Sequence, residues 1–229
     1  MAAHLPDHVL ETAAGTGFLS RTLRDLLPGT VHLTATDLVP MRLDVARPKF
    51  QADEQVEFQV ADATELPFAP SSFDVVVCQF GVMFFPDKEK SYREVHRVLV
   101  GGGHYLFNVW DSHRYNPFGR LLHEAVTPAG LGWTVPFSYH EIDPIKESLL
   151  GASFTSISAT VVSVETTVPS AAVFARGAVQ GSPLAAQLQS STVAAEVVVA
   201  ALASAIGREF GPDPFRMPLQ AIVFEARKK

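Results

Sequence analysis

The chain has 229 residues, with 18 Lys and Arg against 24 Asp and Glu, so its formal net charge is −6. This acidic balance argues against a nucleic-acid binder that works by neutralising phosphates. Hydrophobic residues make up 47% and charged residues 18%, an ordinary globular mix that excludes wholesale disorder.

The first part of the chain alternates apolar strands with amphipathic helices. In the predicted helix 18–27, Phe18, Leu19 and Leu23 fall at helical spacing, and Pro28-Gly29 ends the helix. A second helix is predicted at 41–47. Four strands are predicted, at 8–13, 31–37, 56–62 and 73–80.

The alternation then repeats once more. A helix is predicted over 87–99, with Asp87 as its N-cap, and Gly101–Gly103 end it. A fifth strand is predicted at 104–110. Strands that alternate with helices indicate parallel βαβ units with helices on both faces of one sheet.

The second half of the chain is less regular. A helix is predicted at 115–126, and loops and helix over the sheet across 111–147. A sixth strand at 154–166, two helices within 170–211 and a last strand at 221–226 complete the prediction. We therefore expect one α/β domain, 1–229, with a cofactor-binding half at 1–110 and a substrate-side half at 111–229. The helical elaborations fall near 111–150 and 169–211.

A glycine turn follows the first predicted strand, in the segment Leu10-Glu-Thr-Ala-Ala-Gly-Thr-Gly17. Such a turn lets a ligand approach the backbone closely and exposes N–H groups at a helix N-terminus. Asp37 ends the second strand, where a carboxylate can accept both hydroxyls of a ribose. Asp62-Ala63 end the third strand, close to where an adenine would lie. These three strand ends together predict a ligand that contains adenosine.

The residues of the turn favour S-adenosylmethionine (SAM) over a dinucleotide. A dinucleotide turn reads G-x-G-x-x-G, and here Ser20 stands at the third glycine position. Glu11 would face a pyrophosphate badly, but its carboxylate suits the ammonium of an amino-acid moiety.

The chain resembles the class I SAM-dependent methyltransferases, of the small-molecule group that includes ubiquinone and menaquinone methyltransferases. The resemblance covers residues 8 to 110. It rests on the segments Val9–Gly17, Asp37–Arg47, Asp62–Phe68, Phe73–Phe80 and Arg93–Leu99. It implies a Rossmann-like, doubly wound, seven-stranded and mostly parallel sheet whose last strand runs antiparallel. It also implies that the cofactor is SAM and that the product is S-adenosylhomocysteine (SAH).

The resemblance implies a role for each matching residue. Glu11 holds the methionine end of SAM, Asp37 with Leu38 the ribose side, and Asp62 with Ala63 the adenine. The turn backbone binds the methionine end through Ala13, Ala14, Gly15, Thr16 and Gly17. Cys78, Gln79 and Phe80, at the end of the fourth strand, flank the methyl donor.

The chain departs from the family pattern at two places. Ala13 stands where the family has a glycine, which ordinary backbone angles at Ala13 would make tolerable. The first strand begins near residue 8, so we expect the chain to lack the usual N-terminal lid helices.

Methyl transfer needs no metal, and no metal site is predicted, because nothing has zinc-ligand spacing. If the acceptor must lose a proton, the base candidates are His113, just after the fifth predicted strand, and His140, because these two histidines remain near the ligand edge. Met83, Phe84, Trp110 and Tyr139 are candidates for an apolar substrate pocket. Cys78 reads as an inert buried thiol.

The expected partner is a small, partly apolar molecule. The sequence predicts no membrane span and no targeting signal, and its one cysteine suits a cytoplasmic protein. The apolar helix at Ala194–Phe210 packs either internally or in a homodimer. Two other functions stay open: a non-catalytic SAM-fold binding protein, and an NAD(P)-dependent oxidoreductase.

Overall fold

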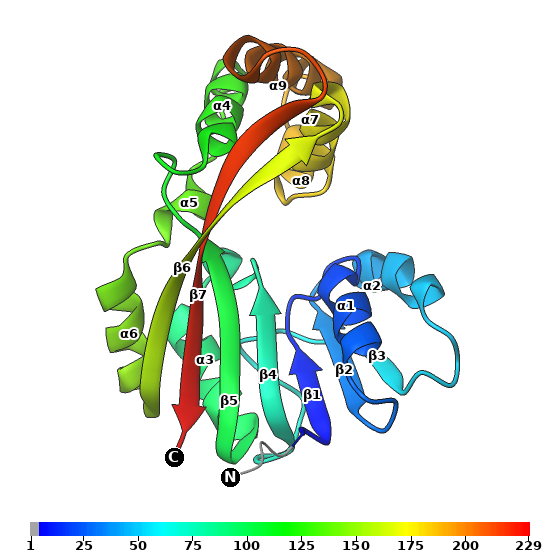
Figure 1. The fold of residues 1–229 in the computed structure, drawn as a ribbon, viewed down its shortest axis with the longest axis vertical. Helices are drawn as coiled ribbons and strands as arrows, with labels where there is room; N and C mark the ends of the chain where they lie inside the picture. The colour runs from blue at the N-terminus through cyan, green and yellow to red at the C-terminus, as the bar shows by residue number, and fades with distance from the viewer. Residues whose placement is uncertain (1–4) are drawn as a thin grey trace. The chain divides into compact units, whose positions relative to one another are not determined.

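The computed structural model describes residues 5–229. Its seven-stranded sheet has the order β3-β2-β1-β4-β5-β7-β6 (Figure 1). The first five strands are mutually parallel, and Figure 1 shows β7 running antiparallel to its neighbours. This confirms the doubly wound, mostly parallel sheet with an antiparallel last strand. The strands are β1 (His8–Glu11), β2 (His32–Asp37), β3 (Val56–Val60), β4 (Phe73–Gln79), β5 (Leu99–Trp110), β6 (Phe154–Val168) and β7 (Phe215–Lys228).

The helices of the first half alternate with the strands as expected. Asp87 caps α3 by accepting a hydrogen bond from the Lys90 N–H at 2.8 Å, as predicted. The helices are α1 (Phe18–Leu26), α2 (Pro40–Ala46), α3 (Lys88–Val98), α4 (Pro117–Val126), α5 (Val135–Ser138), α6 (Ile142–Gly151), α7 (Ala171–Gln180), α8 (Leu184–Gln189) and α9 (Ala195–Phe210). In residues 5–229 no helix is both long and apolar enough to cross a bilayer.

The chain divides into two compact units. The first unit comprises the chain through Val109, His140–Thr160 and Ile222–Lys229. The second unit comprises Trp110–Tyr139 and Val161–Ala221. Each unit has its own buried core, so we describe them separately.

In the first unit, helices cover both faces of the parallel strands. Leu23 and Leu27 of α1 pack against Val9, Val31 and Leu33 on one face. On the other face the Tyr92 ring of α3 lies against aromatic rings of β5, with centroids 5.7 Å apart for Phe107. Burial on both faces is typical of parallel strands and explains their nearly continuous apolar sequences.

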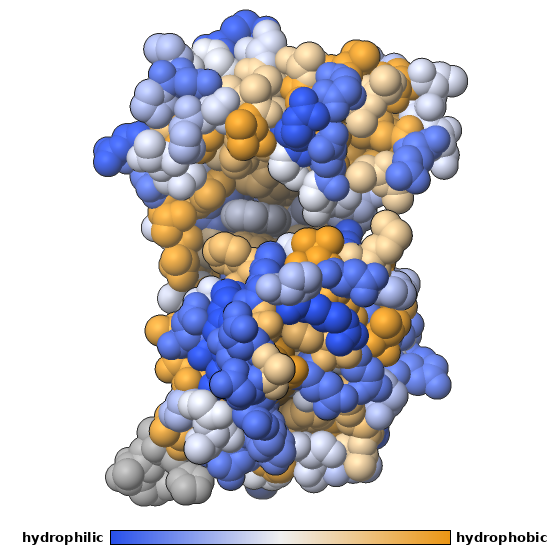
Figure 2. Space-filling model, turned by 90° about the vertical axis from the view of Figure 1, so that its right-hand side faces the viewer, coloured by the Kyte–Doolittle hydropathy of each residue, from blue (hydrophilic) through white to orange (hydrophobic). Residues whose placement is uncertain are grey.

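The surface over α1, α2 and β3 is mixed. Figure 2 shows hydrophilic side chains over most of this face, interrupted by separate apolar ones. The exposed apolar side chains of the two helices include Phe18, Leu26, Met41 and Val45. Apolar side chains dispersed in this way are ordinary on a protein surface.

The second unit holds α4, α5, α7, α8 and α9 together with the paired segments of β6 and β7 that lie within Val161–Ala221 (Figure 1). Helix α9 buries Val198, Leu202 and Ile206 and contacts both α7 and α4. The apolar face of α9 is therefore covered within the same chain. Asn116, fully buried before α4, donates from Nδ2 to the carbonyl oxygens of Asp111 and Gln220, both at 2.9 Å.

Two sequence expectations were wrong in this region and in β5. Gly101–Gly103 do not end α3 but lie inside β5, because the chain turns extended directly after Val98. Between the pairs Phe73↔Leu99 and Val75↔His104, β4 advances by two residues and β5 by five, so the glycines form a bulge. Residues 170–211 form three helices instead of two, because Gly181-Ser182-Pro183 separate α7 from α8.

The last two strands are longer than their sequences indicate. β7 begins at Phe215, and β6 continues to Val168. Cross-strand contacts sustain the extra length: Ser163 Oγ donates to Gln220 Oε1 at 2.6 Å, and Arg216 pairs with Glu165 at 2.9 Å. Pairing between strands, and not local preference, sets these ends.

Candidate active site

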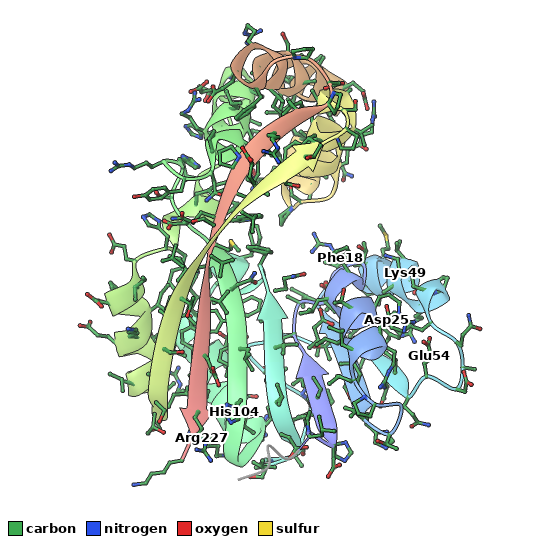
Figure 3. The ribbon with its side chains drawn as sticks, in the orientation of Figure 1. Phe18, Asp25, Lys49, Glu54, His104 and Arg227 are labelled. Atoms are coloured by element: carbon green, nitrogen blue, oxygen red, sulfur yellow. The ribbon has the colours of Figure 1, made fainter. Side chains whose placement is uncertain are left out.

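The turn between β1 and α1 uses its two glycines differently. Gly17 has φ +78°, and a Cβ on it would lie 2.8 Å from the Ala46 Cβ of α2, so it allows two helices to approach. Gly15 has φ +57°, and a Cβ there would meet nothing within 4 Å. Gly15 therefore leaves its backbone open to a ligand. Thr16 closes the turn, because its carbonyl oxygen accepts a hydrogen bond from Lys49 Nζ at 2.7 Å, near Phe18 (Figure 3).

Ordinary backbone angles, the condition under which alanine would be tolerable at position 13, are not found in the structure. Ala13 has φ 54°, in the left-handed region that costs a residue with a Cβ about 1–2 kcal/mol. Alanine therefore stands at a position that suits glycine, and the rest of the fold holds it there. Its neighbour Ala14 is buried and donates its N–H to the Thr36 carbonyl oxygen at 2.8 Å, which fixes the turn on β2.

Asp37, at the end of β2, is directly joined to the glycine turn. Its Oδ2 accepts a hydrogen bond from the Gly15 N–H at 2.8 Å, and its Oδ1 accepts one from the Val39 N–H at 2.9 Å. Each carboxylate oxygen has two lone pairs, so both can accept one more donor. Leu38 beside it is largely exposed.

Glu11, the last residue of β1, is a buried acid with 1% of its surface exposed. Ser20 Oγ donates a hydrogen bond to Glu11 Oε2 at 2.5 Å. Burial, helped by the negative charge of Asp37, raises the pKa of Glu11 to about 7. The carboxylate thus lies where a buried cation would stabilise it.

The loop after β3 forms a third part of the site. Asp62 Oδ1 accepts hydrogen bonds from the Thr64 N–H at 2.7 Å and from Thr64 Oγ1 at 2.8 Å, and Ala63 is buried beside it. α3 holds the rest of the loop, because Glu94 accepts the Leu66 N–H and Arg97 donates to the Leu66 carbonyl oxygen. The loop is therefore ordered by hydrogen bonds on both sides.

The end of β4 carries Cys78, Gln79 and Phe80. Phe80 has φ 51°, and its N–H donates to Asn108 Oδ1 at 2.9 Å. Burial raises the pKa of the Cys78 thiol to about 12, which fits the expected inert thiol. Asn108 was missed by the sequence analysis, although a polar residue opposite Gln79 in an apolar strand is a usable signal.

The turns after β1 and β4 meet where the Gly81 backbone packs against the Ala13 side chain. A Cβ added to Gly81 would lie 2.6 Å from the Ala13 Cβ and 2.7 Å from Cys78 Sγ. Because only a glycine fits there, the positions of the two turns are coupled. The predicted cofactor residues at the ends of β1, β2 and β4 thus belong to one edge of the sheet in the first unit.

The predicted base and substrate residues are divided between the units. His113, Trp110 and Tyr139 lie in the second unit, and His140 in the first. The His113 ring lies 4.6 Å from that of Phe137, and the Trp110 ring 5.5 Å from that of Phe118.

Two more substrate candidates, Met83 and Phe84, lie in the first unit, in a turn after β4. Met83 is 2% exposed, so its side chain fills the core, whereas Phe84 is half-buried. In residues 5–229 no cluster of His, Cys, Asp and Glu could hold a metal ion.

Comparison with known proteins identifies the segment that carries this edge. Residues 10–107 match the family model described as a methyltransferase domain. A demethylmenaquinone methyltransferase of Deinococcus radiodurans is 36% identical over 130 residues, which are 55% of this chain and 54% of that protein. The chain thus spans about half the length of the curated relatives it matches.

Solved structures share the fold at low identity. The YcgJ protein of Bacillus subtilis aligns over 100% of this chain and 94% of its own, with TM-score 0.64 and 20% identity. A Haemonchus contortus phosphoethanolamine N-methyltransferase, in complex with SAH, aligns over 98% of this chain and 49% of its own, with TM-score 0.59 and 20% identity. Residues 10–107, less than half of the chain, therefore resemble a methyltransferase domain, and the whole chain shares the fold of these solved structures.

Proposed function

We propose that this chain binds SAM and transfers its methyl group to a small, partly apolar molecule. One observation carries the proposal: the Gly15 N–H donates to Asp37 Oδ2 at 2.8 Å within the segment that matches the methyltransferase domain. This bond joins an open glycine backbone to a carboxylate that suits a ribose. It lies at the carboxyl edge of the sheet, where open α/β sheets bind ligands.

The residues present fit each part of SAM. The buried Glu11 carboxyl would hold the ammonium of SAM, because burial disfavours the charged carboxylate and a positive charge beside it would stabilise that form. Asp37 would accept the two ribose hydroxyls with its remaining lone pairs. Asp62 Oδ2 and the Ala63 N–H would bind the adenine edge.

Methyl transfer needs little general acid or base catalysis from the protein. Bound SAM supplies an electrophilic methyl group on a sulfonium. The protein's contribution is to hold the acceptor in line with that methyl, which in well-oriented systems gives effective molarities of about 10⁵–10⁸ M. We assign His113 or His140 as base only for an acceptor that must lose a proton.

The remaining assignments follow from this proposal. The part through residue 110 would bind the cofactor, and residues 111–229 would shape the acceptor side. The relatives named as demethylmenaquinone methyltransferases support a quinone-type acceptor. We propose the cytoplasm as the compartment, since the one thiol suits reducing conditions. The covered apolar face of α9 gives no support to a homodimer through that helix.

A turnover experiment tests the proposal. The purified chain is incubated with methyl-labelled SAM and a panel of reduced quinones, and labelled product and SAH are quantified. Equal molar amounts of both are expected. Tight SAM binding without SAH formation on any acceptor would favour a non-catalytic binding protein. Binding of NAD without binding of SAM would favour an oxidoreductase.

A further inference from the structure

A cleft of about 260 Å³ opens on the α1 face of the sheet, wholly within the first unit. Its walls are apolar, formed by Leu19 and Leu23 of α1, Val77 of β4, Leu106 of β5 and Val223 of β7. The polar side chains that line it are Gln79 and Asn108. Its volume lies just below the about 300–1,000 Å³ of typical ligand pockets, so it suits a small ring system.

The two amides stand side by side at the carboxyl end of the cleft. Gln79 and Asn108 are direct partners in the parallel β4–β5 ladder. Because both line the same cleft, their side chains lie on the same face of the sheet. Phe80 follows immediately, in the segment that the resemblance assigns to the methyl donor.

The hydrogen-bond pattern determines which way the Asn108 amide is turned. Its Oδ1 accepts the Phe80 N–H at 2.9 Å, so the oxygen is committed to the turn and Nδ2 remains as a donor. Among residues 5–229, neither the Asn108 nor the Gln79 NH₂ group donates to a protein acceptor. Two amide NH₂ groups therefore line an apolar cleft, and neither has a protein acceptor for its hydrogen bonds in the described part of the chain.

We infer that this cleft binds the methyl acceptor as a flat apolar ring whose oxygen substituent accepts hydrogen bonds from Asn108 Nδ2 and from the Gln79 amide. The inference rests on the proposed function and deepens it. A phenol, phenolate or ring carbonyl oxygen matches two neutral donors, whereas a cationic ligand would find no charged partner among the lining residues.

The same arrangement gives the amides a role during the reaction. The ring attacks the methyl carbon, the carbon–sulfur bond breaks, its electron pair stays on sulfur, and the acceptor's proton passes to solvent or to a base. Donors that are already oriented toward the ring oxygen stabilise its negative charge as the nucleophile forms. Asn108 also holds Phe80 at its positive φ, so it acts on the methyl-donor turn as a positioning residue.

A pair of probes tests the inference. 1-Tetralone and tetralin differ by one ring carbonyl oxygen, which accepts hydrogen bonds and cannot donate them, and their binding to the SAH-loaded chain is measured by ligand-observed NMR. A neutral hydrogen bond is worth about two- to tenfold in affinity, so two donors predict that wild type prefers the ketone about tenfold.

Two variants locate the preference. Asn108→Asp keeps an acceptor for the Phe80 N–H and removes the NH₂ donor, and Gln79→Glu makes the same change on the neighbouring strand. Each should reduce the preference for the ketone to about two- to threefold or less, because one donor becomes an acceptor and the ketone oxygen cannot donate to it. Gln59→Glu on β3 is the matched control and should keep the wild-type preference.

Every result decides the inference. Loss of the preference in either folded variant, with the control unchanged, supports it. Equal binding of both probes by wild type, binding of neither probe, or an unchanged preference in both variants overturns it. SAH titration of the same wild-type sample separates the two claims, because failure to bind SAH refutes the proposed function, whatever the probes do.

Discussion

The buried Glu11 carboxyl makes the stability of this protein depend on pH. Glu11 is 1% exposed, and the only hydrogen bond of its carboxyl group found within residues 5–229 is the one it accepts from Ser20 Oγ at 2.5 Å. Its pKa rises from 4.5 to about 7 on folding, chiefly because burial disfavours the charged form. A carboxyl whose pKa is raised in the folded state favours folding less as pH rises.

The magnitude follows from linkage. The unfolded chain releases the Glu11 proton near pH 4.5, whereas the folded chain holds it until about pH 7. Between these values the folded state binds more protons, so this group lowers the free energy of unfolding as pH increases. At 1.36 kcal/mol per pKa unit, the loss between pH 5 and pH 8 amounts to about 2–3 kcal/mol.

Urea unfolding of Glu11→Gln against wild type at pH 5, 6, 7 and 8 measures this effect. The glutamine keeps an oxygen for Ser20 and cannot ionise. The variant should gain about 2–3 kcal/mol relative to wild type between the two extremes of pH. Glu57→Gln, a change at an exposed position of β3, should show no such trend. A pH-independent difference for Glu11→Gln would refute the account of a carboxyl destabilised by burial.

Three further predictions concern the turn and the thiol. Ala13→Gly should raise stability in thermal melts by about 0.5–1 kcal/mol by relieving the left-handed φ of 54°. Ala14→Gly is the control and should lower stability by a similar amount. The same change in stability for both variants would contradict the strain at Ala13. Gly17→Ala should lower the free energy of unfolding in urea by about 2–4 kcal/mol, because the added Cβ would lie 2.8 Å from the Ala46 Cβ. Gly15→Ala should lower it by about 1–2 kcal/mol, because only its positive φ is unfavourable. A larger loss for Gly15→Ala than for Gly17→Ala would be inconsistent with the packing of α1 on α2. Cys78, 1% exposed with a pKa of about 12, should resist a thiol reagent at pH 8 until the chain is unfolded, and rapid labelling of the native chain would show that the strand opens.

The parallel part of the fold could be predicted because local pattern and tertiary role agree there. The runs at Val9–Leu10 and Val75–Cys78 are apolar since both faces of these strands are buried, and helix 18–27 is spaced for one covered face. The glycines at 101–103 misled the prediction because glycine ends helices but also forms bulges. Only the pairing of β5 with β4 distinguishes the two.

The candidate site was predictable where single residues carry the chemistry. Glu11 and Asp37 are the last residues of their strands and Gly15 lies just after β1, and the parallel sheet brings these strand ends together. The left-handed φ of Ala13 and of Phe80 could not be predicted, since neither residue type favours it. Asn108 escaped notice because its role depends on the Phe80 N–H, which lies 28 residues away in the sequence.

Calorimetric titration with SAH, SAM and NAD tests the central claim most directly. Wild type should bind both sulfur ligands with micromolar affinity and should not bind NAD. Asp37→Asn should weaken SAH binding at least tenfold, because a charged hydrogen-bond acceptor for the ribose is lost, while Asp44→Asn on the exposed side of α2 should bind as wild type does. Binding of NAD alone, or SAH affinity unaffected by Asp37→Asn, would contradict the assignment of this edge as a SAM site.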